Sequence, residues 1–92
     1  SKFGLDGFTV SLSAEYSSKG IMANCVAPGF IDTALTRRML KQNEMKELIS
    51  KVPTARLGEV GEISNLVLWL SSKENTFTTG QNIAIDGGFT RV

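Results

Sequence analysis

Residues 24–33 read NCVAPGFIDT, and they carry the clearest structural signal of the chain. An apolar run from Ile21 to Ala27 stops at the pair Pro28-Gly29, after which a loop begins. Because proline lacks a backbone donor and glycine frees the backbone, the chain must leave a sheet at this point. Open parallel sheets bind their ligands just past the carboxyl ends of buried strands. The stretch therefore predicts a buried strand followed by the wall of a ligand site.

The overall composition is that of an ordinary globular protein. The 92 residues are 41% hydrophobic and 21% charged, which is enough for one small domain with a thin core. Ten basic and nine acidic residues leave a net charge of +1, so neither nucleic acid nor a membrane is expected as a partner. A single cysteine excludes an internal disulfide, and we expect a cytoplasmic protein. The chain lacks histidine, the commonest metal ligand, so we expect no metal site.

Helical and extended patterns alternate along the chain. We expect a helix over residues 1–19 that ends at Gly20, a strand over 21–27, short helices between 30 and 51, a helix over 59–71 and a final strand over 82–85. This order indicates an α/β fold with right-handed parallel crossovers. The first helix carries two apolar stripes, and Val60, Ile63, Val67 and Leu70 form the core stripe of the later one.

Several polar residues have predictable local partners. Asn24 interrupts an apolar strand, so its amide should bond the backbone of a neighbouring segment. Thr33 is placed to cap a helix, and Asp86 to accept backbone N–H groups of the Gly87-Gly88 turn. Arg56 is expected at the surface or at a subunit contact. Taken alone, Lys2 is a solvated lysine, Thr33 only a cap, and Pro28-Gly29 only a turn.

Two strands cannot form a complete parallel sheet, because such sheets are normally covered on both faces and extended at both edges. The chain also opens with Ser1 in the middle of a helical pattern. We therefore expect residues 1–92 to be part of a longer protein.

Short elements in a fixed order identify a related family: Ser1-Lys2, Gly4-Leu5, Gly7-Phe8-Thr9, Gly20-Ile21, residues 24–29, Ile31, Thr33, Arg56-Leu57-Gly58, Glu62-Ile63, Thr79-Gly80-Gln81 and Asp86-Gly87-Gly88. Together they resemble the carboxyl-terminal part of the short-chain dehydrogenase/reductases, in particular the 3-oxoacyl-carrier-protein reductases. The resemblance implies a Rossmann-type doubly wound parallel sheet, of which only the last two strands and their helices are present. Residues 1–92 would be the carboxyl-terminal part of a single oxidoreductase domain, with a substrate loop at about 30–51.

The same resemblance implies an oxidoreductase that interconverts an alcohol and a carbonyl with NAD or NADP. In the family pattern a catalytic tyrosine lies four residues before a lysine, so Lys2 would take the lysine position and the tyrosine would precede Ser1. The lysine would lower the pKa of that tyrosine and bind the nicotinamide ribose. Pro28 and Gly29 would lie against the nicotinamide, while the Ile31 backbone and the Thr33 hydroxyl would hold its carboxamide.

Two further expectations and two alternatives follow from the resemblance. The parent protein should be a homo-oligomer, whereas the separate 92-residue chain should be inactive because the catalytic tyrosine and serine are absent. One alternative is a non-catalytic truncated relative that serves as a binding or oligomerisation module. The other keeps the enzyme but exchanges an acyl thioester for a sugar or steroid substrate.

Overall fold

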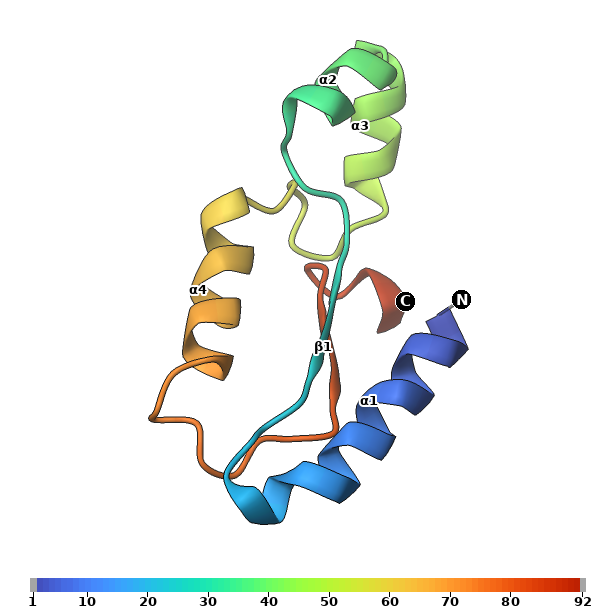
Figure 1. The fold of residues 1–92 in the computed structure, drawn as a ribbon. Helices are drawn as coiled ribbons and strands as arrows, with labels where there is room; N and C mark the ends of the chain where they lie inside the picture. Colours follow the sequence, from blue (N-terminus) through green and yellow to red (C-terminus); the bar gives the residue numbers. More distant parts are fainter. Residues whose placement is uncertain (1, 92) are drawn as a thin grey trace. The chain divides into compact units, whose positions relative to one another are not determined.

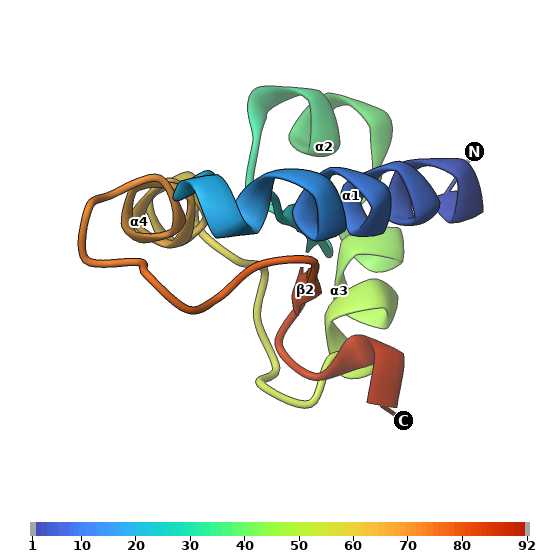
Figure 2. The same cartoon turned by 60° about the horizontal axis from the view of Figure 1, so that its bottom comes forward.

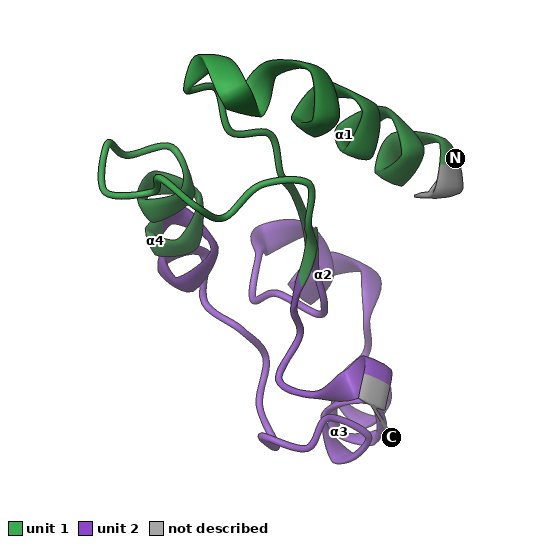
Figure 3. Cartoon of the chain, turned by 90° about the horizontal axis from the view of Figure 1, so that it is seen from below, with its two compact units in different colours: residues 1–27, 65–83 green, residues 28–64, 84–92 purple. Residues whose placement is uncertain are grey.

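The structure is a computed structural model that describes the backbone of residues 2–91 and the side chains of residues 4–90. Helices and strands follow in an α/β order (Figure 1): α1 (Lys2–Tyr16), η1 (Ser17–Lys19), β1 (Cys25–Pro28), α2 (Ala34–Met39), α3 (Gln42–Ser50), α4 (Val60–Leu70), β2 (Asn82–Ile85) and η2 (Phe89–Arg91). The chain divides into two compact units, residues 1–27 with 65–83 and residues 28–64 with 84–92 (Figure 3).

The two strands pair in parallel, as the sequence predicted. Cys25 N–H donates to the Gln81 carbonyl at 2.8 Å, and Gly29 N–H donates to the Ile85 carbonyl at 3.1 Å. Because the partners of Cys25 and Gly29 advance in the same direction, the strands run parallel. The connection between them contains α2, α3 and α4.

The predicted strand over 21–27 begins too early, because a side chain replaces the backbone at its start. The Asn24 amide nitrogen donates to the Thr78 carbonyl at 2.9 Å, and its oxygen accepts the Gln81 N–H at 3.1 Å. These bonds confirm the expected role of Asn24. They also explain why regular pairing begins only at Cys25.

A cluster of hydroxyl groups anchors the end of α1 in the first unit. The Thr79 Oγ1 lies 2.8 Å from the Ser13 Oγ and 2.9 Å from the Ser17 Oγ, and it accepts the Ala23 N–H at 3.1 Å. Gly80 adopts a φ of 73° beside this cluster, where a Cβ would lie 2.9 Å from the Ser13 Oγ. One threonine therefore links α1, η1 and the segments that lead into both strands.

Local sequence signals set the helix ends. α1 runs directly into η1 (Figure 2), and Gly20 stops it with a φ of 81°, as predicted. The Thr33 hydroxyl accepts the Thr36 N–H, which confirms the predicted cap of α2. At the end of α4, the buried Asn75 amide donates to the Leu70 carbonyl at 2.9 Å.

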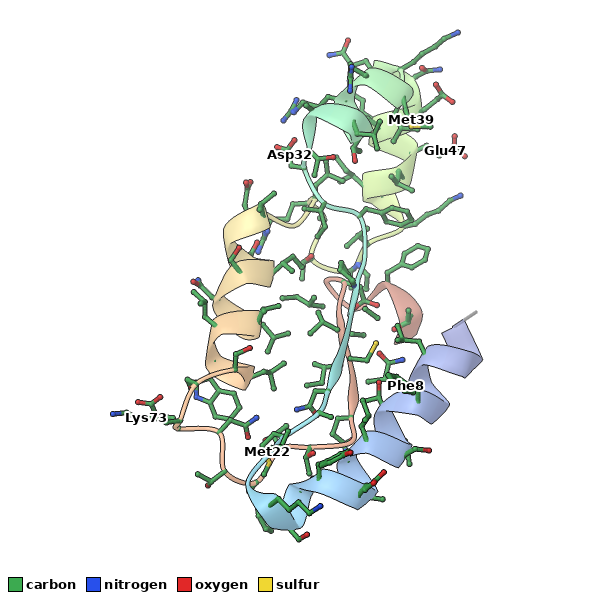
Figure 4. All side chains as sticks on the ribbon, viewed as in Figure 1. Phe8, Met22, Asp32, Met39, Glu47 and Lys73 are labelled. Carbon is green, nitrogen blue, oxygen red and sulfur yellow. The ribbon has the colours of Figure 1, made fainter. Side chains whose placement is uncertain are left out.

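Few apolar side chains are buried within the described residues. Val52 and Leu57 are the buried hydrophobic residues there, and none of the α4 side chains is buried. Ile63 and Leu70 of the predicted core stripe are half-buried, but Val60 and Val67 are exposed. Figure 4 shows Phe8 on α1 and Met39 on α2, which are also exposed. Among residues 2–91, no helix is both long and apolar enough to cross a membrane.

The Thr79 cluster predicts that Thr79→Val destabilises the protein by about 1–3 kcal/mol, because the Ala23 N–H and two hydroxyls lose their partner. Thr79→Ser should retain most of the stability. The matched control is Thr76→Val, at an exposed threonine that makes no hydrogen bond in the described part of the chain. Urea unfolding measures all three, and equal stability of Thr79→Val and Thr76→Val would contradict the role of the cluster.

Candidate functional site

The loop after β1 is held against the end of β2 by a glycine. A Cβ built on Gly29 would lie 2.6 Å from the Cβ and 2.8 Å from the Cα of Asp86. These distances are far below ordinary van der Waals contact, and one of the neighbouring atoms belongs to the backbone. Residue 29 therefore has to be glycine for the two strand ends to approach this closely.

Two residues further on, Ile31 forms a parallel bridge with Gly58. Gly58 N–H donates to the Phe30 carbonyl at 2.9 Å, and the Asp32 N–H donates to the Gly58 carbonyl at 2.8 Å. In this arrangement the N–H and C=O of Ile31 point away from Gly58. No hydrogen bond in the described part of the chain uses either group, so both are available to a ligand.

The Thr33 hydroxyl adds a third polar group next to this backbone. It accepts the Thr36 N–H at 3.1 Å and lies 2.9 Å from the Thr36 hydroxyl. A hydroxyl oxygen has two lone pairs, so when the Thr33 hydroxyl donates to that of Thr36, one lone pair is left to accept a further hydrogen bond. The loop thus offers an amide donor, a carbonyl acceptor and a hydroxyl within three residues.

A salt bridge lies beside the loop. The Arg37 Nε donates to the Asp32 Oδ1 at 2.6 Å and its Nη2 to the Oδ2 at 2.7 Å (Figure 4 labels Asp32). Hydrogen bonding to Arg37 lowers the pKa of Asp32, so this carboxyl stays ionised at neutral pH.

A second bidentate pair joins Arg56 to Glu62. The Arg56 Nη1 and Nη2 donate to the Glu62 carboxylate at 2.7 and 3.0 Å, and the Glu59 N–H donates to the same carboxylate at 3.0 Å. The Arg56 hydrogen bonds, and then that of Glu59, lower the pKa of Glu62 to about 2. The surface position expected for Arg56 is correct, but its partner is Glu62 of the same chain. The Glu62 carboxylate also caps the start of α4.

Arg56 and Glu62 border a small cavity of about 180 Å³ that lies wholly within the second unit. Its lining includes Ile31, Gly58, Arg56, Glu62 and Asp86. The Asp86 carboxylate accepts the Gly88 N–H at 2.9 Å and the Thr90 N–H at 3.0 Å, which confirms the expected role of Asp86. No cluster of three metal-binding side chains occurs among the described residues.

Four of the five predicted site residues belong to one continuous segment of the second unit, namely Pro28, Gly29, Ile31 and Thr33. Lys2, the fifth, begins α1 in the first unit, and its side chain lies outside the described residues. Sequence reasoning missed the partners of the loop, which are Gly58, Arg37 and Asp86. Only Arg37 could have been found from the sequence. It lies one helical turn after the cap Thr33, and the acidic Asp32 directly before that cap is a suitable partner for it.

The α/β order and the parallel strands are those of a Rossmann-type protein, and the solved structures that match this chain have the same fold. Comparison with known proteins gives the family. Residues 1–90 match the family described as enoyl-(acyl carrier protein) reductase, and the chain belongs to the short-chain dehydrogenase/reductases.

Curated and solved relatives agree with this assignment. The chain is 47% identical over 88 residues to the 3-oxoacyl-(acyl-carrier-protein) reductase FabG of Buchnera aphidicola. The aligned region covers 96% of this chain and 36% of the relative. Its structure matches that of YwfH, an NADPH-dependent reductase, with a TM-score of 0.89, 28% identity and coverage of 97% and 37% of the two chains. A protein from Agrobacterium tumefaciens with bound NADP, assigned as a 2-deoxy-D-gluconate 3-dehydrogenase, matches with a TM-score of 0.88, 30% identity and coverage of 99% and 37%. The chain thus spans little more than a third of these relatives.

The close approach at Gly29 predicts that Gly29→Ala separates the loop from Asp86 and weakens binding of any ligand held by that loop. The matched control is Gly61→Ala, because no described atom lies within 4 Å of a Cβ at Gly61 and alanine favours the helix by about 0.5–1 kcal/mol. Thermal unfolding should show a loss of stability for Gly29→Ala and a gain for Gly61→Ala. A Gly29→Ala protein as stable as wild type would show that the contact is not tight.

The Arg56–Glu62 pair predicts a specific loss of stability in acid. Because the pKa of Glu62 is depressed to about 2 from an ordinary 4.5, the pair stabilises the fold above pH 4.5 and loses this effect as the pH falls toward 2. Glu62→Gln should remove this part of the pH dependence. Urea unfolding between pH 2 and 7 tests it, and parallel curves for wild type and Glu62→Gln would contradict the prediction.

Proposed function

We propose that residues 1–92 are the carboxyl-terminal part of a single Rossmann-fold domain. The whole protein would be an NAD(P)-dependent oxidoreductase that interconverts an alcohol and a carbonyl. The family match, the share of just over one third of each relative, and the sparse core of this chain support the proposal. The NADPH named for YwfH and the NADP bound in the Agrobacterium protein support the cofactor class.

The unpaired backbone of Ile31 is the observation that carries this function. A nicotinamide carboxamide has one carbonyl acceptor and one NH₂ donor group. The Ile31 N–H would donate to the carbonyl, while the Ile31 carbonyl and the Thr33 hydroxyl would accept from the NH₂. The loop therefore has the donor and acceptor set that the carboxamide requires. The backbone of Gly29 and the ring of Pro28 would lie against the nicotinamide.

When bound, the nicotinamide supplies or accepts the hydride. Lys2 at the start of α1 would stand one helical turn after a tyrosine that precedes Ser1 in the parent. At that spacing its ammonium would lower the pKa of the tyrosine and bind the cofactor ribose. The tyrosine would then exchange a proton with the substrate oxygen. The loop at 29–33 would determine which face of the nicotinamide meets the substrate.

For the substrate we favour a 3-oxoacyl thioester, since the acyl-carrier-protein reductase is 47% identical and the sugar-acid dehydrogenase only 30%. Residues 30–51 would form the substrate loop, where Leu35 and Met39 expose apolar surface of the kind an acyl chain contacts. Exposed apolar residues on α1, such as Leu5 and Phe8, support a homo-oligomer. The cytoplasm remains the proposed location.

The proposed chemistry is tested with the full-length protein that contains this chain. It should oxidise NADPH or NADH in the presence of a 3-oxoacyl thioester, and more slowly with sugar or steroid ketones. Lys2→Met should lower kcat by about 100-fold or more. The control Lys73→Met, in an exposed loop and without an ion pair among residues 2–91, should leave kcat unchanged.

The separate 92-residue chain should show no turnover at all. Measurable activity of the pure 92-residue chain, or full activity of Lys2→Met, would overturn the assigned roles. Absence of turnover by the full-length protein with every ketone would instead favour a non-catalytic binding or oligomerisation module.

A further inference from the structure

We infer that Arg37 is a positioning residue, which holds the Asp32-Thr33 segment in the geometry that recognises the carboxamide. The inference rests on the proposed function, because it assigns Arg37 a role in the cofactor loop. Arg37 itself would not touch the cofactor. It would act by holding Asp32 and Thr33 in place.

Arg37 contacts this segment through its backbone and its side chain. Its backbone N–H donates to the Thr33 carbonyl at 3.1 Å, which is the ordinary first helical hydrogen bond of α2. Its guanidinium returns to the Asp32 carboxylate through two hydrogen bonds of 2.6 and 2.7 Å. Since the Asp32 N–H is itself bonded to the Gly58 carbonyl, residues 32 and 33 are fixed from both sides. The Ile31 carbonyl directly precedes this fixed segment, and the Thr33 hydroxyl belongs to it.

The salt bridge is better suited to orientation than to stability. The Arg37 side chain is 66% exposed and that of Asp32 24% exposed, and exposed ion pairs contribute little to folding. A bidentate arginine–carboxylate pair nevertheless fixes the relative angle of its two planar groups. Loss of this pair should therefore loosen the loop without unfolding the protein.

Arg38 provides a matched control on the same helix. It follows Arg37 directly, is exposed, and forms no ion pair in the part of the chain that the structure describes. Removal of Arg38 changes the net charge of the protein as much as removal of Arg37 does. A difference between the two variants therefore reports the pair with Asp32 and not the overall charge.

The experiment compares two ligands that differ only in the carboxamide. Calorimetric titration of the full-length protein measures Kd for NAD⁺ or NADP⁺, whichever it binds, and for the matching 3-acetylpyridine analogue, which has a methyl group in place of the NH₂. Wild type should prefer the natural cofactor by about tenfold, because the analogue leaves two acceptors of the loop unpaired. Thr33→Val should reduce this ratio, and Thr33→Ser should restore it.

If Arg37 positions the loop, Arg37→Met reduces the ratio to about two- or threefold, and Arg37→Lys gives an intermediate value since lysine retains the charge but not the fork. Arg38→Met keeps the wild-type ratio. The unfolding temperature of Arg37→Met should stay within about 2 °C of wild type. A wild-type ratio in Arg37→Met, whatever its unfolding temperature, overturns the role of Arg37. An unchanged ratio in Thr33→Val as well overturns the proposed carboxamide site itself.

Discussion

The close contact between Gly29 and Asp86 is the constraint on which the loop after β1 depends. The Gly29 N–H still pairs with the Ile85 carbonyl at 3.1 Å, so the two strands remain in register to their last residues. From there Phe30 packs edge-on against Phe89, with ring centroids 4.9 Å apart. The next residue, Ile31, then contacts Gly58. A Cβ on Gly58 would lie only 2.9 Å from the Cδ1 of Ile31. Two glycines thus fix the path of the backbone that presents the unpaired groups of Ile31.

The sequence could predict those features that depend on one residue type in one position. Gly20 at the end of the first helix, Thr33 as a cap and Asn24 as a backbone partner were each predictable, because few residues satisfy these local needs. The parallel strands followed from the order of helical and extended segments. The start of β1 was not predicted correctly, since an asparagine side chain that replaces a backbone pair leaves no mark on apolar periodicity.

Other features were beyond prediction because they join segments distant in sequence. The bridge between Ile31 and Gly58 depends on the course of two loops, and no pattern in either loop encodes it. Arg56 could be placed at the surface, but Glu62 as its partner follows only from the turn that precedes α4. The apolar stripe of α4 was predicted with the correct period, yet Val60 and Val67 are exposed. Periodicity shows which face of a helix is apolar but not what covers that face.

The two kinds of relatives bear on where specificity would arise under the proposed function. This chain matches a sugar-acid dehydrogenase with a TM-score of 0.88 and is 47% identical to an acyl-thioester reductase. These relatives are named for substrates of very different polarity, and a fold does not by itself select a substrate. The loop at 29–33 would contact the carboxamide of the cofactor and not the substrate, so it would not distinguish substrates either. Under the proposed function, selection would then depend on side chains such as Leu35 and Met39, which α2 exposes only a few residues beyond the loop at 29–33.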